Sequence, residues 1–340
     1  MLIKNLRHGR RIACVVFVGV AALALSGTLP TASSRARGPR PAGFTQRKLM
    51  PAFRLPAATF TPLPTRAPTH MPGRGGTNLD PNLRGNLGSA RSLLHVSSVR
   101  FAHNDPNLVS DARAVHAAGL QPIVIMTGCS VSDPTVRLTA NKTLLKQMHQ
   151  VFGAASIWWE LGNENDLQCG LSATQYTTMW NRGISALRLM FPQDRFGGPV
   201  NFQANPTYIA YFVRHATPKP DFISWHEYTC ASTDRPNDCI RNVATWTTHV
   251  RTTRQDIAAV GLRAPPIYIT EYNYAPDGRV CADAMHNDPT FITQWTTTAL
   301  RTLAGNNVAE SYQFDTANCL PLETPSGSLT PQGRVFAHFF

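Results

Sequence analysis

Three of the six glutamates in this 340-residue chain stand at or near the ends of short apolar segments. Glu164 ends "SIWWELGNE" (156–164), Glu227 lies in "DFISWHEY" (221–228), and Glu271 lies in "PIYITEYN" (266–273). Two carboxyl groups held close together can divide the work of cleaving a glycosidic bond. One protonates the leaving oxygen, and the other attacks the anomeric carbon or activates water. Glu164 and Glu271 are the candidates for such a pair.

A scaffold must bring these distant segments together, and the sequence from residue 76 onward predicts one. Short apolar segments alternate with longer amphipathic ones, a pattern typical of parallel strands joined by helices. The expected strands lie in 75–80, 97–103, 121–128, 156–164, 195–201, 221–228, 266–273 and 310–315. The expected helices include Thr143–Phe152, Ser172–Met190, Thr207–His215, Ile240–Val260 and Asp288–Ala304.

Eight such units predict an α/β fold, the closed (β/α)₈ TIM barrel. An open doubly wound sheet is the alternative, but no Gly-rich phosphate loop follows the first strand. In a barrel, chemistry takes place where the strands end. Glu164 ends the fourth strand and Glu271 the seventh, so we expect them to face each other across the barrel mouth.

Strand alternation separates two further glutamates, Glu160 and Glu227, from this pair. Glu160 has the same parity as Glu164, so it should point into the barrel as a structural hydrogen-bonding group. Glu227 has the opposite parity to His226 and Tyr228, so it should point away from the mouth.

These segments resemble the clan A retaining glycoside hydrolases, in which an Asn-Glu pair ends the fourth strand and a Glu ends the seventh. "WELGNEND" and "IYITEYN" match those two signatures, "SWHEY" matches the His-x-Tyr of the sixth strand, and Arg100 in "SVRF" matches a position in the second. The resemblance covers residue 76 to the end and is closest to families 39, 79 and 51. The sequence departs from it at Asn165-Asp166, where many relatives have a proline after the glutamate.

The resemblance implies roles for these residues. Glu164 would be the general acid/base and Glu271 the nucleophile, with net retention of configuration. A nearby carboxylate and partial burial favour the protonated form that Glu164 needs. Asn163 would hydrogen-bond the sugar 2-hydroxyl.

The resemblance also implies that Arg100 and Tyr228 keep Glu271 ionised and correctly aimed, with His226 lining the same pocket. Sugar subsites need aromatic platforms, and Trp225 and Tyr272 stand near strand ends, as do Tyr274 and Phe314. Each of these rings fits a core position as well as a platform. We count Trp225 and Tyr272 among the candidate substrate-binding residues.

The net charge of +12 belongs to the N-terminal part of the chain. Residues 1–75 contain twelve basic residues and no acid, so residues 76–340 carry 20 basic and 20 acidic residues. A neutral domain has no excess charge to neutralise phosphates, which argues against nucleic-acid binding.

The N-terminal part also predicts export. Basic residues precede an apolar run, Ile12–Leu25, so residues 1–25 are expected to be a signal peptide, with an uncleaved anchor as the alternative. Residues 26–75, rich in Pro, Arg, Ala and Thr, predict a disordered linker. We interpret the linker as a spacer; weak cell-surface association through its arginines is the alternative.

Six cysteines follow the signal segment, and an even number in an exported protein favours disulfides. Two of the pairs below would join neighbouring loops on the barrel's catalytic face and the third, Cys230–Cys239, would lie within the loop after the sixth strand, although six cysteines allow 15 connectivities. The expected pairs are Cys129–Cys169, Cys230–Cys239 and Cys281–Cys319.

Together these features predict a secreted retaining glycoside hydrolase, with residues 76–340 as the catalytic domain of a monomer. Its substrate would be a polysaccharide or glycoconjugate with β-O-glycosidic bonds, and we expect neither a cofactor nor a metal. His103 and Asp105 could form a metal pair, but such residues in a loop are usually polar contacts. A catalytically silent carbohydrate-binding barrel and a cell-surface interaction protein are the alternatives.

Overall fold

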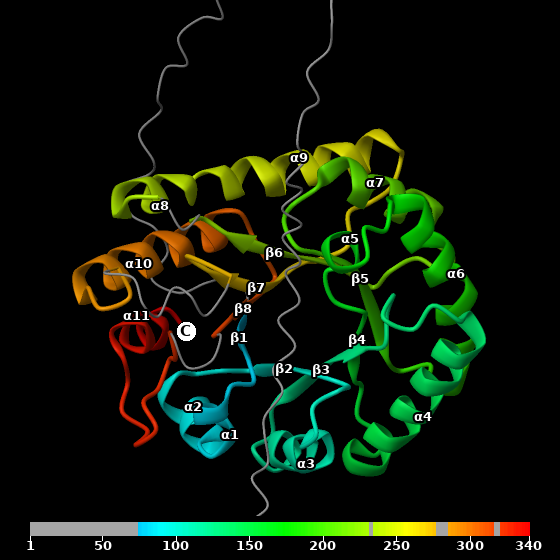
Figure 1. Cartoon of the computed structure of the whole chain (residues 1–340), viewed down its shortest axis with the longest axis horizontal. Helices are drawn as coiled ribbons and strands as arrows, with labels where there is room; N and C mark the ends of the chain where they lie inside the picture. Colours follow the sequence, from blue (N-terminus) through cyan, green and yellow to red (C-terminus); the bar gives the residue numbers. More distant parts are fainter. Residues whose placement is uncertain (1–73, 231–233, 277–284, 316–319) are drawn as a thin grey trace, which may run out of the picture. The chain divides into compact units, whose positions relative to one another are not determined.

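A computed structural model describes residues 74–230, 234–276, 285–315 and 320–340. Eight parallel strands close into a barrel in chain order, because β1 pairs with both β2 and β8 (Figure 1). This closure confirms the (β/α)₈ barrel and excludes the open sheet. The strands are β1 (Arg74–Asn78), β2 (Ser98–Ala102), β3 (Gln121–Met126), β4 (Trp158–Leu161), β5 (Arg195–Asn201), β6 (Phe222–Tyr228), β7 (Ile267–Asn273) and β8 (Glu310–Gln313).

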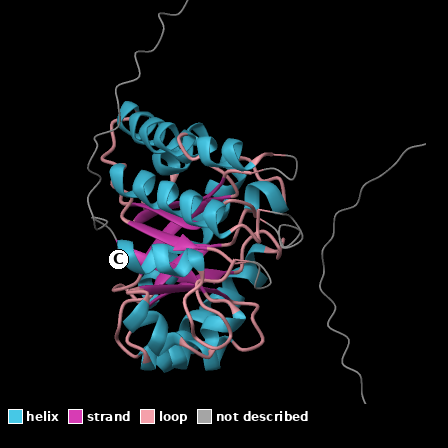
Figure 2. Cartoon of the chain, turned by 90° about the vertical axis from the view of Figure 1, so that its left-hand side faces the viewer, coloured by secondary structure: helices cyan, strands magenta, loops and turns pink. Residues whose placement is uncertain are grey.

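Helices surround the strands, as the two perpendicular views show (Figures 1 and 2). They are α1 (Pro81–Arg84), α2 (Leu87–Leu93), α3 (Leu108–Ala117), α4 (Pro134–Phe152), α5 (Asn165–Gln168), α6 (Ala173–Met190), α7 (Pro206–His215), α8 (Pro236–Asn242), α9 (Thr245–Ala259), α10 (Pro289–Gly305) and α11 (Pro331–Phe339). Among the described residues, none of the helices has the length and apolar character that crossing a membrane requires.

Two expected helix boundaries were wrong. α4 begins at Pro134 rather than Thr143, because Asp133 caps it by accepting the Thr135 and Val136 N–H groups. The helix expected over Ile240–Val260 is two helices, α8 and α9. Asn242, which ends α8, donates to the Thr229 carbonyl at 2.9 Å and so anchors this break beside β6.

Alternation along the strands separates two apolar layers. A small cluster fills the interior of the barrel. It is formed by Ile123, Trp158, Phe222, Tyr268 and Tyr312. The neighbouring residues along those strands, such as Trp159, Ile223 and Ile269, belong to the larger core between barrel and helices. The barrel interior is therefore packed with side chains and is not an open pore.

Two of the three expected disulfides are present. Cys129 joins Cys169, and Cys230 joins Cys239. Both bridges follow strand ends on the same face of the barrel as Glu164 and Glu271. Cys281 and Cys319 lie outside the described residues, as do the expected signal peptide and nearly all of the linker.

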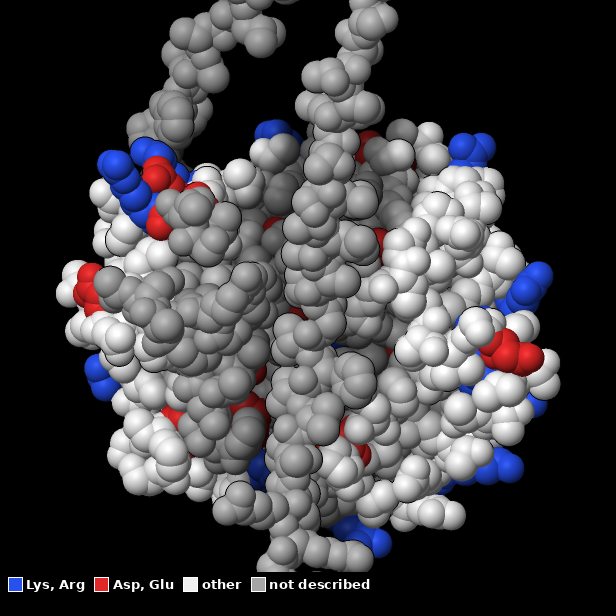
Figure 3. All heavy atoms as spheres, in the orientation of Figure 1, with Lys and Arg blue, Asp and Glu red and all other residues white. Residues whose placement is uncertain are grey.

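Lys and Arg side chains are scattered mostly around the edge of the face seen in Figure 3, with Asp and Glu beside several of them. This distribution agrees with the neutral charge of residues 76–340 and offers no basic patch on the visible described surface.

The pairing of the remaining cysteines can be tested directly. Peptide mapping of the purified protein without reduction should yield the two observed bridges and a third, Cys281–Cys319. A cross-pair between these two cysteines and the other four would contradict the expected connectivity.

A buried acid at the end of the barrel opposite to Glu164 and Glu271 makes the stability depend on pH. Glu310, at the start of β8, accepts hydrogen bonds from Tyr312 and Ser98, and Arg74 lies near enough to act on its charge. Burial outweighs these groups and raises the pKa of Glu310 to about 7. Between the ordinary glutamate pKa and this value, the unfolded chain releases a proton that the folded chain keeps. The free energy of unfolding must therefore fall as pH rises through that window.

Glu310→Gln removes this ionisation and keeps an oxygen that can accept from Tyr312. We compare the free energy of unfolding of the variant with that of wild type at each pH. This difference should shift by about 2 kcal/mol in favour of the variant from pH 5 to pH 8. Urea denaturation at the two pH values measures this difference. If the substitution changed the free energy of unfolding by the same amount at pH 5 and pH 8, the raised pKa of Glu310 would be contradicted.

Candidate active site

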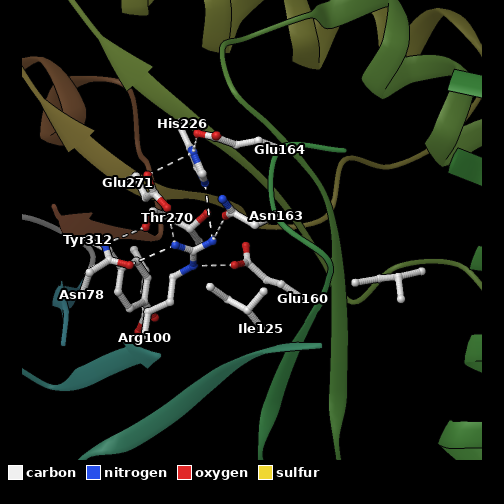
Figure 4. Close-up of polar contacts among 12 residues, drawn as sticks. Asn78, Arg100, Ile125, Glu160, Asn163, Glu164, His226, Thr270, Glu271 and Tyr312 are labelled. Atoms are coloured by element: carbon white, nitrogen blue, oxygen red, sulfur yellow. Dashed lines mark hydrogen bonds and ion pairs between the residues drawn. The ribbon is translucent and has the colours of Figure 1, made fainter. Parts of the chain in front are cut away.

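Glu164 and Glu271 come together at the ends of β4 and β7. One carboxylate oxygen of each, with a ring nitrogen of His226, forms a group whose atoms all lie within 4.8 Å of one another. The side chain of Glu164 is 14% exposed and that of Glu271 is 7% exposed. Figure 4 shows both converging on His226 above Arg100. The two glutamates therefore lie close together at the strand ends, as predicted.

A β-bulge in β7 determines where Glu271 points. Ile269 pairs with Trp225, and the next pair is Glu271 with His226, so Thr270 has no counterpart in β6. The pairing with β8 shifts at the same place. One extra residue reverses the alternation of all that follow it. Tyr268 belongs to the interior cluster and Ile269 to the outer core, and the bulge turns Glu271 back to the interior.

The end of β4 places Glu164 through an unusual backbone. Gly162 has φ of 74°, and Glu164 itself adopts the left-handed region with φ of 44° and ψ of 43°. The Glu164 N–H donates to the Val200 carbonyl at 2.9 Å. Val200 has φ of 58° and is the residue that the pairing of β5 with β6 skips. A left-handed non-glycine residue costs about 1–3 kcal/mol, so the surroundings must hold this conformation in place.

Asn165 and Asp166, where the sequence departs from the clan A pattern that it resembles, supply part of that support. The Asn165 side chain accepts from the Cys129 N–H at 2.9 Å and donates to the Leu161 carbonyl at 3.1 Å. Asp166 accepts from the Phe202 N–H at 3.1 Å. These bonds tie the segment after Glu164 to the loops that follow β3 and β5.

Arg100 is fully buried beneath the two glutamates and donates to four side chains. Its Nε donates to Glu160 at 2.6 Å, and its Nη1 donates to Glu271 at 2.6 Å. Nη1 also donates to Asn78 at 2.9 Å, and Nη2 donates to Asn163 at 2.6 Å. Because Arg100 holds the Asn163 oxygen, the amide N–H groups of Asn163 are left for another acceptor.

The surroundings of Glu271 favour its ionised form. Burial opposes ionisation, but the charges of His226 and Arg100 and hydrogen bonds from Tyr228 and Arg100 outweigh it and lower the Glu271 pKa. The Tyr228 hydroxyl donates to Glu271 Oε2 at 2.6 Å. Burial and the nearby Glu271 raise the Tyr228 pKa well above its usual value, which keeps this hydroxyl a donor.

Glu164 has a different environment. Its Oε1 lies 2.8 Å from His226 Nδ1, whereas Arg100 binds Glu271 instead. It is also the more exposed of the two side chains. The site therefore contains one carboxylate held ionised by a buried cation and a second that is open to the barrel mouth.

The other two glutamates lie as predicted. Glu160 points into the barrel and binds Arg100 from below. Glu227 is buried on the outer side, where it accepts from the Trp225 indole at 2.7 Å and contacts His249 at 3.0 Å.

Two predicted substrate-binding residues were wrong. Trp225 and Tyr272 are both 0% exposed and pack in the core between barrel and helices, so neither can offer its ring to a sugar. Trp225 pairs with Ile269 and Tyr272 with Glu227, all on the outer side of the strands. Tyr274 is also fully buried.

An aromatic group lies at the mouth instead, and one of its members, Phe202, was missed by the sequence analysis. Phe202, after β5, stacks on Tyr228 with ring centroids 5.8 Å apart. Phe314, after β8, meets the same tyrosine edge-on at 6.2 Å. Both phenylalanines are partly exposed. The only sequence signal for Phe202 as a residue of the mouth was its position directly after a predicted strand.

His103 and Asp105 do not form a metal pair. His103 Nδ1 lies 3.1 Å from the Ile125 carbonyl oxygen, and Asp105 pairs with Arg84. Glu164, His226 and Glu271 have donor atoms close enough for a cation. However, Arg100 already provides positive charge at Glu271, and a cation would compete with it.

Solved structures of other proteins share this architecture. A monomeric β-xylosidase from Caulobacter crescentus CB15 matches with a TM-score of 0.60 and 15% identity, over 79% of this chain and 69% of its own. A glucosidase from Croceicoccus marinus matches with a TM-score of 0.59 and 14% identity, over 79% and 68%. An endoglucanase matches with a TM-score of 0.54 and 12% identity, over 78% and 96%. No family model and no curated protein matches the sequence. At these identities the likeness shows the fold alone.

The ionisation of Glu271 can be tested without a substrate. Tyr228→Phe removes a donor to the charged form, so the Glu271 pKa should rise. Labelling with carboxyl-¹³C glutamate gives six carboxyl signals, one for each glutamate, and Glu271→Gln identifies the relevant one. Tyr208→Phe is the matched control, because the buried Tyr208 hydroxyl has no hydrogen-bond partner among the described residues. An unchanged Glu271 titration in Tyr228→Phe would contradict the role of the hydroxyl.

Proposed function

We propose that this chain is a retaining glycoside hydrolase of the clan A type, which cleaves β-O-glycosidic bonds through a glycosyl-enzyme intermediate. The proposal rests on the pair Glu164 and Glu271, with one oxygen of each within 4.8 Å of the other. Retaining enzymes hold their carboxyl groups about 5–5.5 Å apart, whereas inverting enzymes need about 6.5–9.5 Å to admit a water molecule. The names of the similar structures, β-xylosidase, glucosidase and endoglucanase, agree with this class.

The two environments divide the roles. Glu271, held ionised by Arg100 and Tyr228, attacks the anomeric carbon and displaces the aglycone. Glu164, open to the mouth, donates its proton to the departing oxygen. It then takes a proton from the water that hydrolyses the intermediate.

The remaining residues bind the sugar. Asn163, whose oxygen is held by Arg100, presents its amide N–H groups to the 2-hydroxyl, a contact that strengthens in the transition state. Tyr228, Phe202 and Phe314 offer apolar faces at the mouth on which a sugar ring can pack. His226, 2.8 Å from Glu164, keeps that carboxyl aimed at the leaving group.

The setting of the enzyme is part of the same proposal. Two disulfides on the catalytic face and the predicted signal segment support secretion of a monomer that acts on a polysaccharide or glycoconjugate. The silent carbohydrate-binding barrel is the second candidate, and the intact carboxyl pair argues against it.

Hydrolysis of a panel of aryl β-glycosides and oligosaccharides by the full chain tests the activity. Glu271→Gln should lower kcat/KM by roughly 1,000-fold or more, because no nucleophile remains. Glu227→Gln is the matched control: Glu227 is a buried glutamate of the neighbouring strand that faces away from the site, and activity should persist. Full activity in Glu271→Gln would show that the nucleophile is wrongly assigned. A wild type that binds oligosaccharides but cleaves none would favour the silent barrel.

The stereochemical outcome is a separate test. ¹H NMR of the product during the first minutes of hydrolysis should show the β-anomer, with the α-anomer appearing only through mutarotation. Initial release of the α-anomer would contradict retention at a β-linkage.

A further inference from the structure

The bulge that aims Glu271 leaves a polar group inside the barrel. Thr270 has no paired residue in β6 or β8, and its carbonyl lies in the interior beside Arg100. A buried carbonyl without a donor costs about 1–3 kcal/mol. The conformation that the proposed nucleophile requires therefore needs a donor at this point.

Asn78, the last residue of β1, supplies that donor. Its Nδ2 donates to the Thr270 carbonyl at 3.0 Å and to the Gln313 carbonyl at 3.1 Å. Its Oδ1 accepts from Arg100 Nη1 at 2.9 Å, and the same Nη1 donates to Glu271 at 2.6 Å. The side chain is 8% exposed, so water offers little substitute for these bonds. Figure 4 shows Asn78 beside Arg100, within reach of both Thr270 and the guanidinium.

We propose that Asn78 is a positioning residue for Glu271, which holds the bulged Thr270 from below and fixes the guanidinium that binds the carboxylate. This inference rests on the proposed function, in which Glu271 is the nucleophile. It adds a residue of β1 to the machinery, one that touches neither Glu271 nor a substrate in the arrangement described.

The chemistry of the position explains why an amide is needed. An aspartate has the same shape, but it cannot donate to two carbonyls and it adds a second negative charge next to Arg100. An alanine leaves two buried carbonyls and one Arg100 N–H without partners. Only an amide donates twice and accepts once at this size.

The first experiment follows Glu271 by ¹³C carboxyl titration, which does not depend on turnover. In Asn78→Asp the new carboxylate competes for Arg100 and repels Glu271, so the titration should move to higher pH. Asn141→Asp is the matched control. Asn141 is also buried and also bonds through both ends of its amide, but its partner is the Thr127 backbone, at 2.9 and 3.0 Å. The Glu271 signal should not move in that variant.

The second experiment uses Asn78→Ala and Asn141→Ala, which introduce no charge. A displacement of the nucleophile of about 1 Å can cost about 100-fold in rate. We expect kcat of Asn78→Ala to fall about 10- to 100-fold, with KM changed less than about threefold, because contacts with the sugar are kept. Asn141→Ala should keep both constants near those of wild type.

The outcomes are distinguishable. A folded Asn78→Asp whose Glu271 titrates as in wild type, or a folded Asn78→Ala with wild-type kcat, overturns the positioning role. If both Asn78 variants fail to fold while the Asn141 variants fold, Asn78 serves the barrel as a whole and the proposal is equally overturned. If wild type hydrolyses nothing, the proposed function fails, whereas the titration result still decides whether Asn78 controls Glu271.

Discussion

The site depends on one buried positive charge. Placing the Arg100 guanidinium in the barrel interior is costly unless every donor finds an acceptor and nearby carboxylates balance the charge. The side chains that do so come from three strands or their ends, and they are Asn78, Glu160, Asn163 and Glu271. The requirement to satisfy Arg100 therefore fixes the positions of groups that are far apart in the sequence.

Irregularities in two strands turn this regular scaffold into a site. Perfect alternation would direct Glu271 toward the helices, and the extra Thr270 directs it inward instead. In β5, the skipped Val200 presents its carbonyl to the N–H of Glu164, whose backbone is left-handed. The side chains of Asn165 and Asp166 hold this strained segment, because they accept hydrogen bonds from the loops that follow β3 and β5. Strain at these positions is consistent with a site whose geometry matters more than its local stability.

The two ends of the barrel have different chemistry. At the end that holds Glu164 and Glu271, the charges of Arg100 and His226 keep Glu271 ionised despite its burial. At the opposite end, Glu310 is equally buried but has only hydroxyl donors and the more distant Arg74, so its pKa rises. The comparison shows that burial alone does not set the ionisation of these acids, because the nearest cation decides it.

The sequence by itself determined the eight strands, their order and the presence of the Glu164–Glu271 pair at strand ends. These features follow from local patterns, namely apolar runs, turn residues and the position of an acid after a strand. It also indicated the inward Glu160 and the outward Glu227, because alternation within one strand is local. Tertiary structure alone decided which residues pair across strands. The skipped Thr270 and Val200, the burial of Trp225 and Tyr272, and the contacts of Asn78 and Phe202 all depend on that register. Register is set by interactions between segments tens to hundreds of residues apart, such as Asn78 with Thr270, and no pattern within a single segment contains it.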